Sequence, residues 1–343
     1  MATDCKYLKR DSNMELLRLV AMLSVILFHL DFLGMGIELH VIEASPLSTI
    51  LGVVGLKSLT MSCVNLFVLV SGWYGIRFTL HKLGALVFQV LFYSLPIYLV
   101  FVSIGRTPFS VNYFLHLLLT NGYWFVGAYL ILFILSPLLN RFAENTTAKE
   151  QRMLLFALFG LMFLYGWISD DKWFDRGCSP LFFICLYLLA RYFSIHRPAF
   201  TLHKPKFYFL FYAAVMMPVV LLGYVLVASG RESWLDKLYQ YNSPVNILCS
   251  VLLLLAFSQL RFHCKIVNWM GRSCFAVYLF HAHPDFYQQV FYPIVRQLFM
   301  TASGFQLLFH TVVLVTVLYL MPILIDQLRI RMWGLFSRLF LGK

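Results

Sequence analysis

Two ionisable side chains, Arg18 and His29, share the first hydrophobic segment of the chain. The segment is long and apolar enough to cross a bilayer, where an ionisable group costs about 2.5–3.5 kcal/mol on insertion scales and by default marks a function. Eleven residues separate the two, and at about 100° per residue His29 returns to within roughly 20° of Arg18, about 16 Å further along the helix. The spacing predicts that both face one internal cavity or path. Histidine is the usual general base near neutral pH.

A less demanding interpretation exists for the arginine. Arg18 can extend toward the inner headgroups and pair with Glu15, three residues earlier on the same helical face. His29 lies deep in the segment and has no short route to the interface, so it is the stronger functional candidate. Asp31 follows closely and completes this first polar group.

The composition predicts an all-α, polytopic membrane protein. Of the 343 residues, 61% are hydrophobic and only 12% are charged, whereas about 25% of residues in soluble domains are charged. The net charge of +12 does not indicate a nucleic-acid partner, because the charges fall between the hydrophobic runs and form no basic patch. The expected partner is the lipid bilayer.

Ten apolar runs are candidate membrane spans, and the charges between them orient the chain. With the N-terminus in the cytoplasm, 19 of the 27 Lys and Arg residues fall in inner segments and 6 in outer ones. This bias predicts cytoplasmic termini. The short loops predict a single membrane domain over residues 1–343, with an interfacial helix near 113–120. The expected spans are 14–33, 49–76, 83–104, 122–140, 153–169, 179–195, 207–228, 245–260, 268–292 and 306–328.

The second span carries a polar group at its inner half. Gly72 and Gly75 allow close approach of a neighbouring helix. Asn65 and Ser71 either join helices by hydrogen bonds or take part in a site. Arg77 closes the span at the inner face, where it either binds an anion or is simply a cytoplasmic positive charge.

Two later blocks add further candidates. Trp124 is either a residue of the outer aromatic belt or part of a site. His281 lies at a depth similar to His29 if both helices run from inside to outside. His281 and His283 do not predict a metal site, because residues two apart on a helix face away from each other. The candidates from these blocks are Trp124, Arg272, Ser273, Tyr278 and His281.

In this order, the blocks NMELLRLVAMLSVILFH, NLFVLVSGWYGIR, YWFVGAYLILFILSPLLN and GRSCFAVYLFH resemble the acyltransferase 3 family of integral membrane O-acyltransferases. The resemblance covers about residues 13–330, and its first and last blocks are the most specific. It implies a ten-helix domain that moves an acyl group, usually acetyl, from cytoplasmic acyl-CoA to a sugar hydroxyl of a surface or exported glycan. Some members carry an additional extracytoplasmic hydrolase-like domain, which we do not expect here.

The resemblance also implies roles for the polar residues. His29 would act as general base or as an acyl-carrying nucleophile, and the sequence leaves both open. Arginines at the inner face would hold the phosphates of acetyl-CoA, and polar side chains would stabilise the developing oxyanion. The arginines are Arg18, Arg77 and Arg272, and the oxyanion candidates are Asn65, Ser71 and Tyr278.

The sequence therefore predicts an enzyme that O-acetylates a cell-surface polysaccharide or its lipid-linked precursor in a bacterial inner membrane, without a metal. The main alternative is a glycan-lipid transporter or flippase. A transporter would also hold Arg and His inside a bundle, but it usually shows repeated halves or matched broken helices, and neither is visible in the sequence. A glycan polymerase and a non-catalytic partner of a glycan synthase are further alternatives. The position of His29 toward the outer half of its span favours an acceptor that reaches it from outside.

Overall fold

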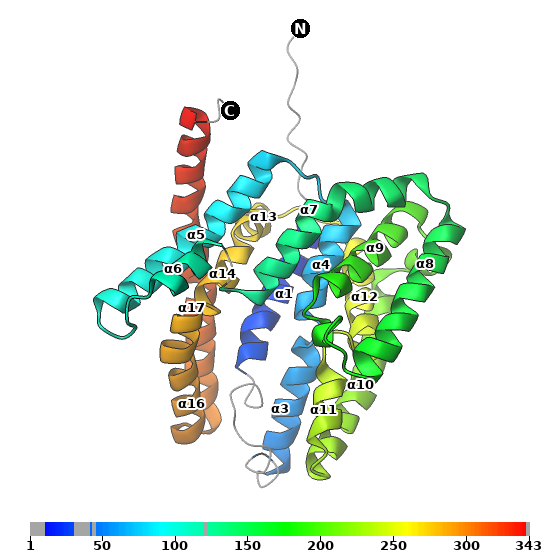
Figure 1. The fold of residues 1–343 in the computed structure, drawn as a ribbon. Helices are drawn as coiled ribbons and strands as arrows, with labels where there is room; N and C mark the ends of the chain where they lie inside the picture. Colours follow the sequence, from blue (N-terminus) through cyan, green and yellow to red (C-terminus); the bar gives the residue numbers. More distant parts are fainter. Residues whose placement is uncertain (1–10, 31–41, 43–45, 120–121, 341–343) are drawn as a thin grey trace.

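The computed structural model describes residues 11–30, 42, 46–119 and 122–340, and Asp31 lies outside these ranges. Within them the chain forms helices and no strand, so the predicted all-α class is confirmed. The helices gather around α1 and α4 at the centre of the bundle (Figure 1). The α-helices are α1 (Ser12–His29), α3 (Leu47–Thr60), α4 (Cys63–Tyr74), α5 (Leu80–Ser103), α6 (Val111–Leu118), α7 (Trp124–Asn145), α8 (Ala148–Leu161), α9 (Pro180–His196), α10 (Pro205–Ala228), α11 (Glu232–Tyr239), α12 (Pro244–Ser258), α13 (Lys265–Arg272), α14 (Cys274–His281), α15 (Pro284–Phe286), α16 (Tyr292–Thr301) and α17 (Gly304–Phe340).

In the described part of the chain, eight helical stretches are long and apolar enough to cross a membrane. A further apolar helix, α9, has 17 residues and falls just short of that length. The multi-pass class is therefore established, whereas the count of ten spans and the cytoplasmic termini remain predictions. The stretches are Ser12–His29, Leu47–Tyr74, Leu80–Ser103, Trp124–Asn145, Ala148–Ile168, Pro205–Ala228, Glu232–Ser258 and Gly304–Leu339.

The candidate span over residues 268–292 is not one continuous helix in the structure. The segment divides into α13, α14, α15 and a π-helical turn, Tyr287–Phe291. Pro284 is one cause, because proline disfavours helical backbone in the residue before it. Tyr123 donates a hydrogen bond to the carbonyl of Leu279 at 2.7 Å and so satisfies a polar group near the break. Irregular backbone at this depth is tolerated where protein surrounds it.

The second expected span also divides, at Met61 and Ser62, into α3 and α4. Ser58 and Thr60 donate to the carbonyls of Val54 and Leu56, each at 2.7 Å, in the last turns before the break. Hydroxyl groups bound back onto the helix in this way tend to bend it. The carbonyl of Met61 accepts a hydrogen bond from Asn246 of α12 at 2.9 Å.

Segments assigned to the same side by the charge pattern are joined by hydrogen bonds. At the end of the bundle where α1 begins, hydrogen bonds join segments that the charge pattern assigns to the cytoplasmic side. At the opposite end of the bundle, they join segments assigned to the outer side. The inner contacts are Tyr74–Asp11 (2.8 Å), Cys264–Ser12 (2.9 Å) and Asn140–Ile76 (2.8 Å). The outer contacts are Thr107–Asp285 (2.9 Å) and Trp167–Lys237 (2.9 Å).

The expected close helix approach at Gly72 is confirmed between α4 and α9. A Cβ atom added to Gly72 would lie 2.5 Å from the carbonyl oxygen of Tyr187 and 2.9 Å from the Cβ of Ala190. Gly75 ends α4 with a φ of 72°, a backbone conformation that favours glycine.

We expect Gly72→Ala to destabilise the protein by about 1–3 kcal/mol, because the added methyl overpacks the α4–α9 contact. Gly127→Ala in α7 is the matched control, since nothing lies within 4 Å of its added Cβ and alanine favours a helix over glycine by about 1 kcal/mol. Thermal unfolding in detergent measures both. Equal midpoints for the two variants would mean that the helices do not need this close approach.

Candidate active site

Two cavities lie along α1, one toward the expected inner end and one beside His29. We call the first the inner cavity and the second the histidine chamber. Their empty volumes are about 1050 Å³ and 430 Å³, and both figures include space open to solvent. Polar residues of the inner cavity include Glu15, Arg18, Ser71, Gln89, Tyr129 and Arg272. The histidine chamber is mainly apolar, and its lining includes His29, Cys63, Trp124, Tyr241 and Tyr278.

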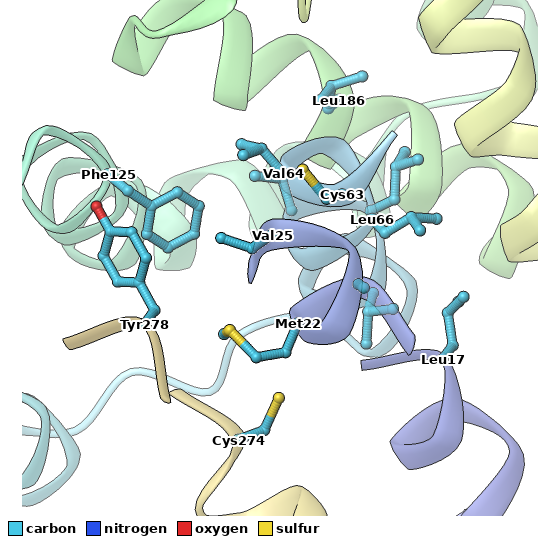
Figure 2. Packing of buried hydrophobic residues seen from close by; sticks show 14 of the residues in the cluster. Leu17, Met22, Val25, Cys63, Val64, Leu66, Phe125, Leu186, Cys274 and Tyr278 are labelled. Atoms are coloured by element: carbon cyan, nitrogen blue, oxygen red, sulfur yellow. The ribbon is translucent and has the colours of Figure 1, made fainter. Parts of the chain in front are cut away.

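Three phenylalanines, Phe67, Phe125 and Phe275, line both cavities. The ring of Phe125 lies 6.3 Å from each of the other two, centroid to centroid. Figure 2 shows Phe125 beside Tyr278, with the Phe125 ring on the side of Val25 of α1. Arg18 and His29 therefore line two adjoining cavities that share an aromatic wall.

His29 and His281 form a hydrogen-bonded pair at the ends of α1 and α14. His29 Nδ1 lies 3.0 Å from His281 Nε2, and His281 Nδ1 lies 2.5 Å from the carbonyl oxygen of Val277. A carbonyl only accepts, so the proton of His281 is on Nδ1 and its Nε2 is an acceptor. His29 then donates from Nδ1, and its own Nε2 is left without a proton.

The hydrogen bonds from His29 to His281 and on to Val277 leave the Nε2 atom of His29 able to accept a proton. His281 is fully buried, whereas His29 is only partly buried and lines the chamber. The edge of the His29 ring also contacts Tyr287, with centroids 5.5 Å apart. The unprotonated Nε2 of His29 is thus held in the form of a base or nucleophile.

The inner cavity holds the predicted arginine together with its predicted partner. Arg18 donates to Glu15 at 3.1 Å, so the pairing considered from the sequence occurs, and both side chains line the cavity. Arg272 also lines it and is exposed. Arg77 is exposed but is not among the lining residues, although the neighbouring Ile76 is.

The remaining sequence candidates divide between the two cavities and the helix contacts. Ser71 lines the inner cavity and donates to the carbonyl of Phe67 at 2.8 Å. Ser273 is buried and accepts a hydrogen bond from Gln327 at 2.9 Å. Asn65 donates to the carbonyl of Tyr241 at 2.9 Å and lines neither cavity. Trp124 and Tyr278 line the histidine chamber together with His29.

Sequence reasoning missed several residues that form these walls. Tyr241 belongs to the loop between α11 and α12, where no periodicity marks it, yet it lines the chamber and stacks on Trp124 with centroids 5.8 Å apart. Phe67, Phe125 and Phe275 are three of 34 phenylalanines, and their apolar surroundings resemble those of lipid-facing rings. Within the described ranges, no group of three or more His, Cys, Asp or Glu is arranged to hold a metal ion.

The fold and the site define a multi-pass helical membrane protein with a histidine pair beside a cationic cavity. Comparison with protein families matches residues 11–325 to the model of the acyltransferase 3 family, described as an acyltransferase domain. The chain belongs to this family and is a membrane acyltransferase. Searches of curated proteins and of solved structures found no match.

We expect the His281 contact to fix the tautomer of His29. In nitrogen-15 NMR of the labelled protein, the His29 ring should carry its proton on Nδ1 in the wild type and in His281→Gln, because the glutamine oxygen still accepts. In His281→Phe the acceptor is lost and the proton should no longer be confined to Nδ1. The signals that disappear in the His29→Gln variant are those of the His29 ring. An unchanged His29 signal in His281→Phe would contradict the role of the pair.

Proposed function

We propose that this protein moves an acetyl group from cytoplasmic acetyl-CoA to a hydroxyl of a cell-surface or exported polysaccharide, or of its lipid-linked precursor, in a bacterial inner membrane. The observation that carries the proposal is the contact of His29 Nδ1 with His281 Nε2 at 3.0 Å, in a chamber that shares a wall with a cavity containing two arginines. Family membership supports acyl transfer in general.

The inner cavity suits the charged end of the donor. CoA carries several phosphate charges, and the guanidinium groups of Arg18 and Arg272 match phosphate oxygens through paired hydrogen bonds. Glu15 holds Arg18 at 3.1 Å and limits the orientations of its side chain. In this arrangement the uncharged pantetheine arm extends from the arginines toward the phenylalanine wall.

The thioester then reaches the histidine chamber past Phe67, Phe125 and Phe275, which line both spaces. The acceptor hydroxyl gives its proton to His29 Nε2 while its oxygen bonds to the acetyl carbon. Collapse of the tetrahedral intermediate breaks the carbon–sulfur bond, and the protonated His29 returns the proton to the sulfur. The products are the acetyl ester and CoA with a free thiol, and no net proton is released.

Two neighbours assist His29 in this scheme. His281 stabilises the positive charge that forms on His29, because its Nε2 accepts a hydrogen bond from His29 Nδ1 at every step. Tyr278 lines the chamber and is the oxyanion candidate that remains close to His29, because Ser71 lines the inner cavity and Asn65 lines neither. The same Nε2 can also accept the acetyl group covalently. An acetylated protein trapped by rapid quenching would favour that two-step route.

The transporter alternative predicts movement of a glycan lipid without chemistry at His29. Membership of an acyltransferase family favours the enzyme. Vesicles that translocate a glycan lipid but never acetylate it would reverse this preference.

We expect His29→Ala to lower acetyl transfer by about 10²–10⁴-fold, the usual contribution of a positioned general base. The assay uses proteoliposomes, radiolabelled acetyl-CoA and a crude glycan-lipid extract, with label counted in the glycan. His310→Ala is the control, because His310 lies exposed on α17 and lines neither cavity. Undiminished transfer by a folded His29→Ala protein would remove His29 from the chemistry.

We expect Arg272→Met to raise the KM for acetyl-CoA about tenfold or more, since it removes charge-assisted hydrogen bonds to phosphate. The KM for the glycan extract should change little. Arg141→Met provides the control, because Arg141 lies exposed in α7 outside both cavities. If both variants raise the donor KM equally, the effect comes from general surface charge and not from a built site.

A further inference from the structure

Five buried polar side chains close in sequence to residues of the histidine chamber have atoms with no hydrogen-bond partner among the described residues. The atoms number seven, and each residue is at most 6% exposed. We call this group the polar cluster. It comprises Ser62 Oγ, Asn65 Oδ1, both amide atoms of Gln240, both amide atoms of Asn242, and Ser243 Oγ.

The polar cluster comes from two segments that hydrogen bonds bring together. One is the break between α3 and α4, and the other is the loop between α11 and α12. Asn65 Nδ2 donates to the carbonyl of Tyr241 at 2.9 Å. Asn246 donates to the carbonyls of Met61 at 2.9 Å and Gln240 at 3.2 Å, one from each segment.

The same two segments provide the wall of the histidine chamber. Cys63 and Val64 line the chamber and stand between Ser62 and Asn65 in the sequence. Tyr241 lines it too and stands between Gln240 and Asn242. Tyr241 therefore connects the two: it lines the chamber that holds His29, and it belongs to the loop that carries Gln240, Asn242 and Ser243.

Polar atoms buried without partners lose their hydration and gain nothing in return. Native proteins rarely leave more than a few such atoms, and each one calls for an explanation. Seven in two adjoining segments call for partners other than the described side chains and backbone, which ordered water or a ligand can supply.

The chemistry of the polar cluster selects the class of ligand. Its side chains are two hydroxyls and three amides, and none carries a charge. Amide and hydroxyl groups both donate and accept, as do the hydroxyl groups of a sugar. The histidine chamber itself is mainly apolar, so it serves the reacting group but not a whole sugar ring.

We infer that the polar cluster is the acceptor subsite and binds the hydroxyl groups of an uncharged sugar unit. This inference rests on the proposed function and specifies its acceptor. Tyr241 lines the chamber and packs between Phe28 and Trp124, at centroid distances of 6.1 Å and 5.8 Å. A sugar that binds the cluster must displace the Tyr241 ring, because the cluster residues are at most 6% exposed in the free protein.

Asn242→Leu tests the inference, because leucine keeps the approximate volume and removes both unpaired amide atoms. We expect an equal or higher thermal midpoint, since no hydrogen bond of the free protein is lost. In the proteoliposome assay, the half-saturating amount of glycan-lipid extract, measured as neutral hexose, should rise at least tenfold. The half-saturating concentration of acetyl-CoA should rise much less than the half-saturating amount of the extract. Ser62→Ala, a smaller change, should act in the same direction and serves if the leucine variant does not fold.

Asn246→Leu is the matched control. Asn246 is equally buried but is fully engaged with Met61, Gln240 and Ser250, so its replacement should lower the thermal midpoint. Two results would overturn the inference and assign the cluster to ordered water only. One is an unchanged half-saturating amount of glycan-lipid extract for a folded Asn242→Leu protein, and the other is a lower thermal unfolding midpoint for this variant. A wild type that neither transfers acetyl nor hydrolyses acetyl-CoA would instead refute the proposed function.

Discussion

The hydrogen bond from His29 to His281 requires two helices to end at the same depth inside the bundle. His29 is the last residue of α1 and His281 the last of α14. A continuous helix over 268–292 would carry its backbone straight past this point. The break before Pro284 lets the chain turn away, and Tyr123 satisfies the carbonyl of Leu279 beside it. The contact between the two histidines thus depends on the break in the backbone after His281.

Both helix breaks described here adjoin the histidine chamber. The break between α3 and α4 is followed at once by Cys63 and Val64, which line it, and the break in the 268–292 segment follows His281. In a membrane, backbone groups freed by a break need partners from the protein. Side chains such as Asn246 and Tyr123 supply them. Both breaks therefore lie beside the proposed site, and the protein supplies hydrogen-bond partners at each.

The sequence was enough to predict the all-α membrane class and the family. It also singled out Arg18 and His29, which line cavities of the bundle, because an ionisable residue within a long apolar run is a strong local signal. From the sequence, His281 could be placed at a depth similar to that of His29, but their contact could not be predicted. The bond between the two rings depends on where α14 stops, which periodicity does not reveal. The break at Met61 also escaped prediction, since neither glycine nor proline marks it. Sequence patterns also do not reveal the phenylalanine wall or Asn242, whose proposed role rests on amide atoms without a partner among the described residues.

The wall of Phe67, Phe125 and Phe275 has a consequence for the electrical barrier of the membrane. Where cavities enter a protein from both sides, the transmembrane voltage falls mainly across the thin apolar layer between them. Moving one elementary charge through 100 mV involves about 2.3 kcal/mol. In the proposed reaction the phosphates of CoA remain on the arginine side, and an uncharged acetyl group passes the aromatic layer. The transfer would then proceed at the same free-energy cost whether or not the membrane is energised.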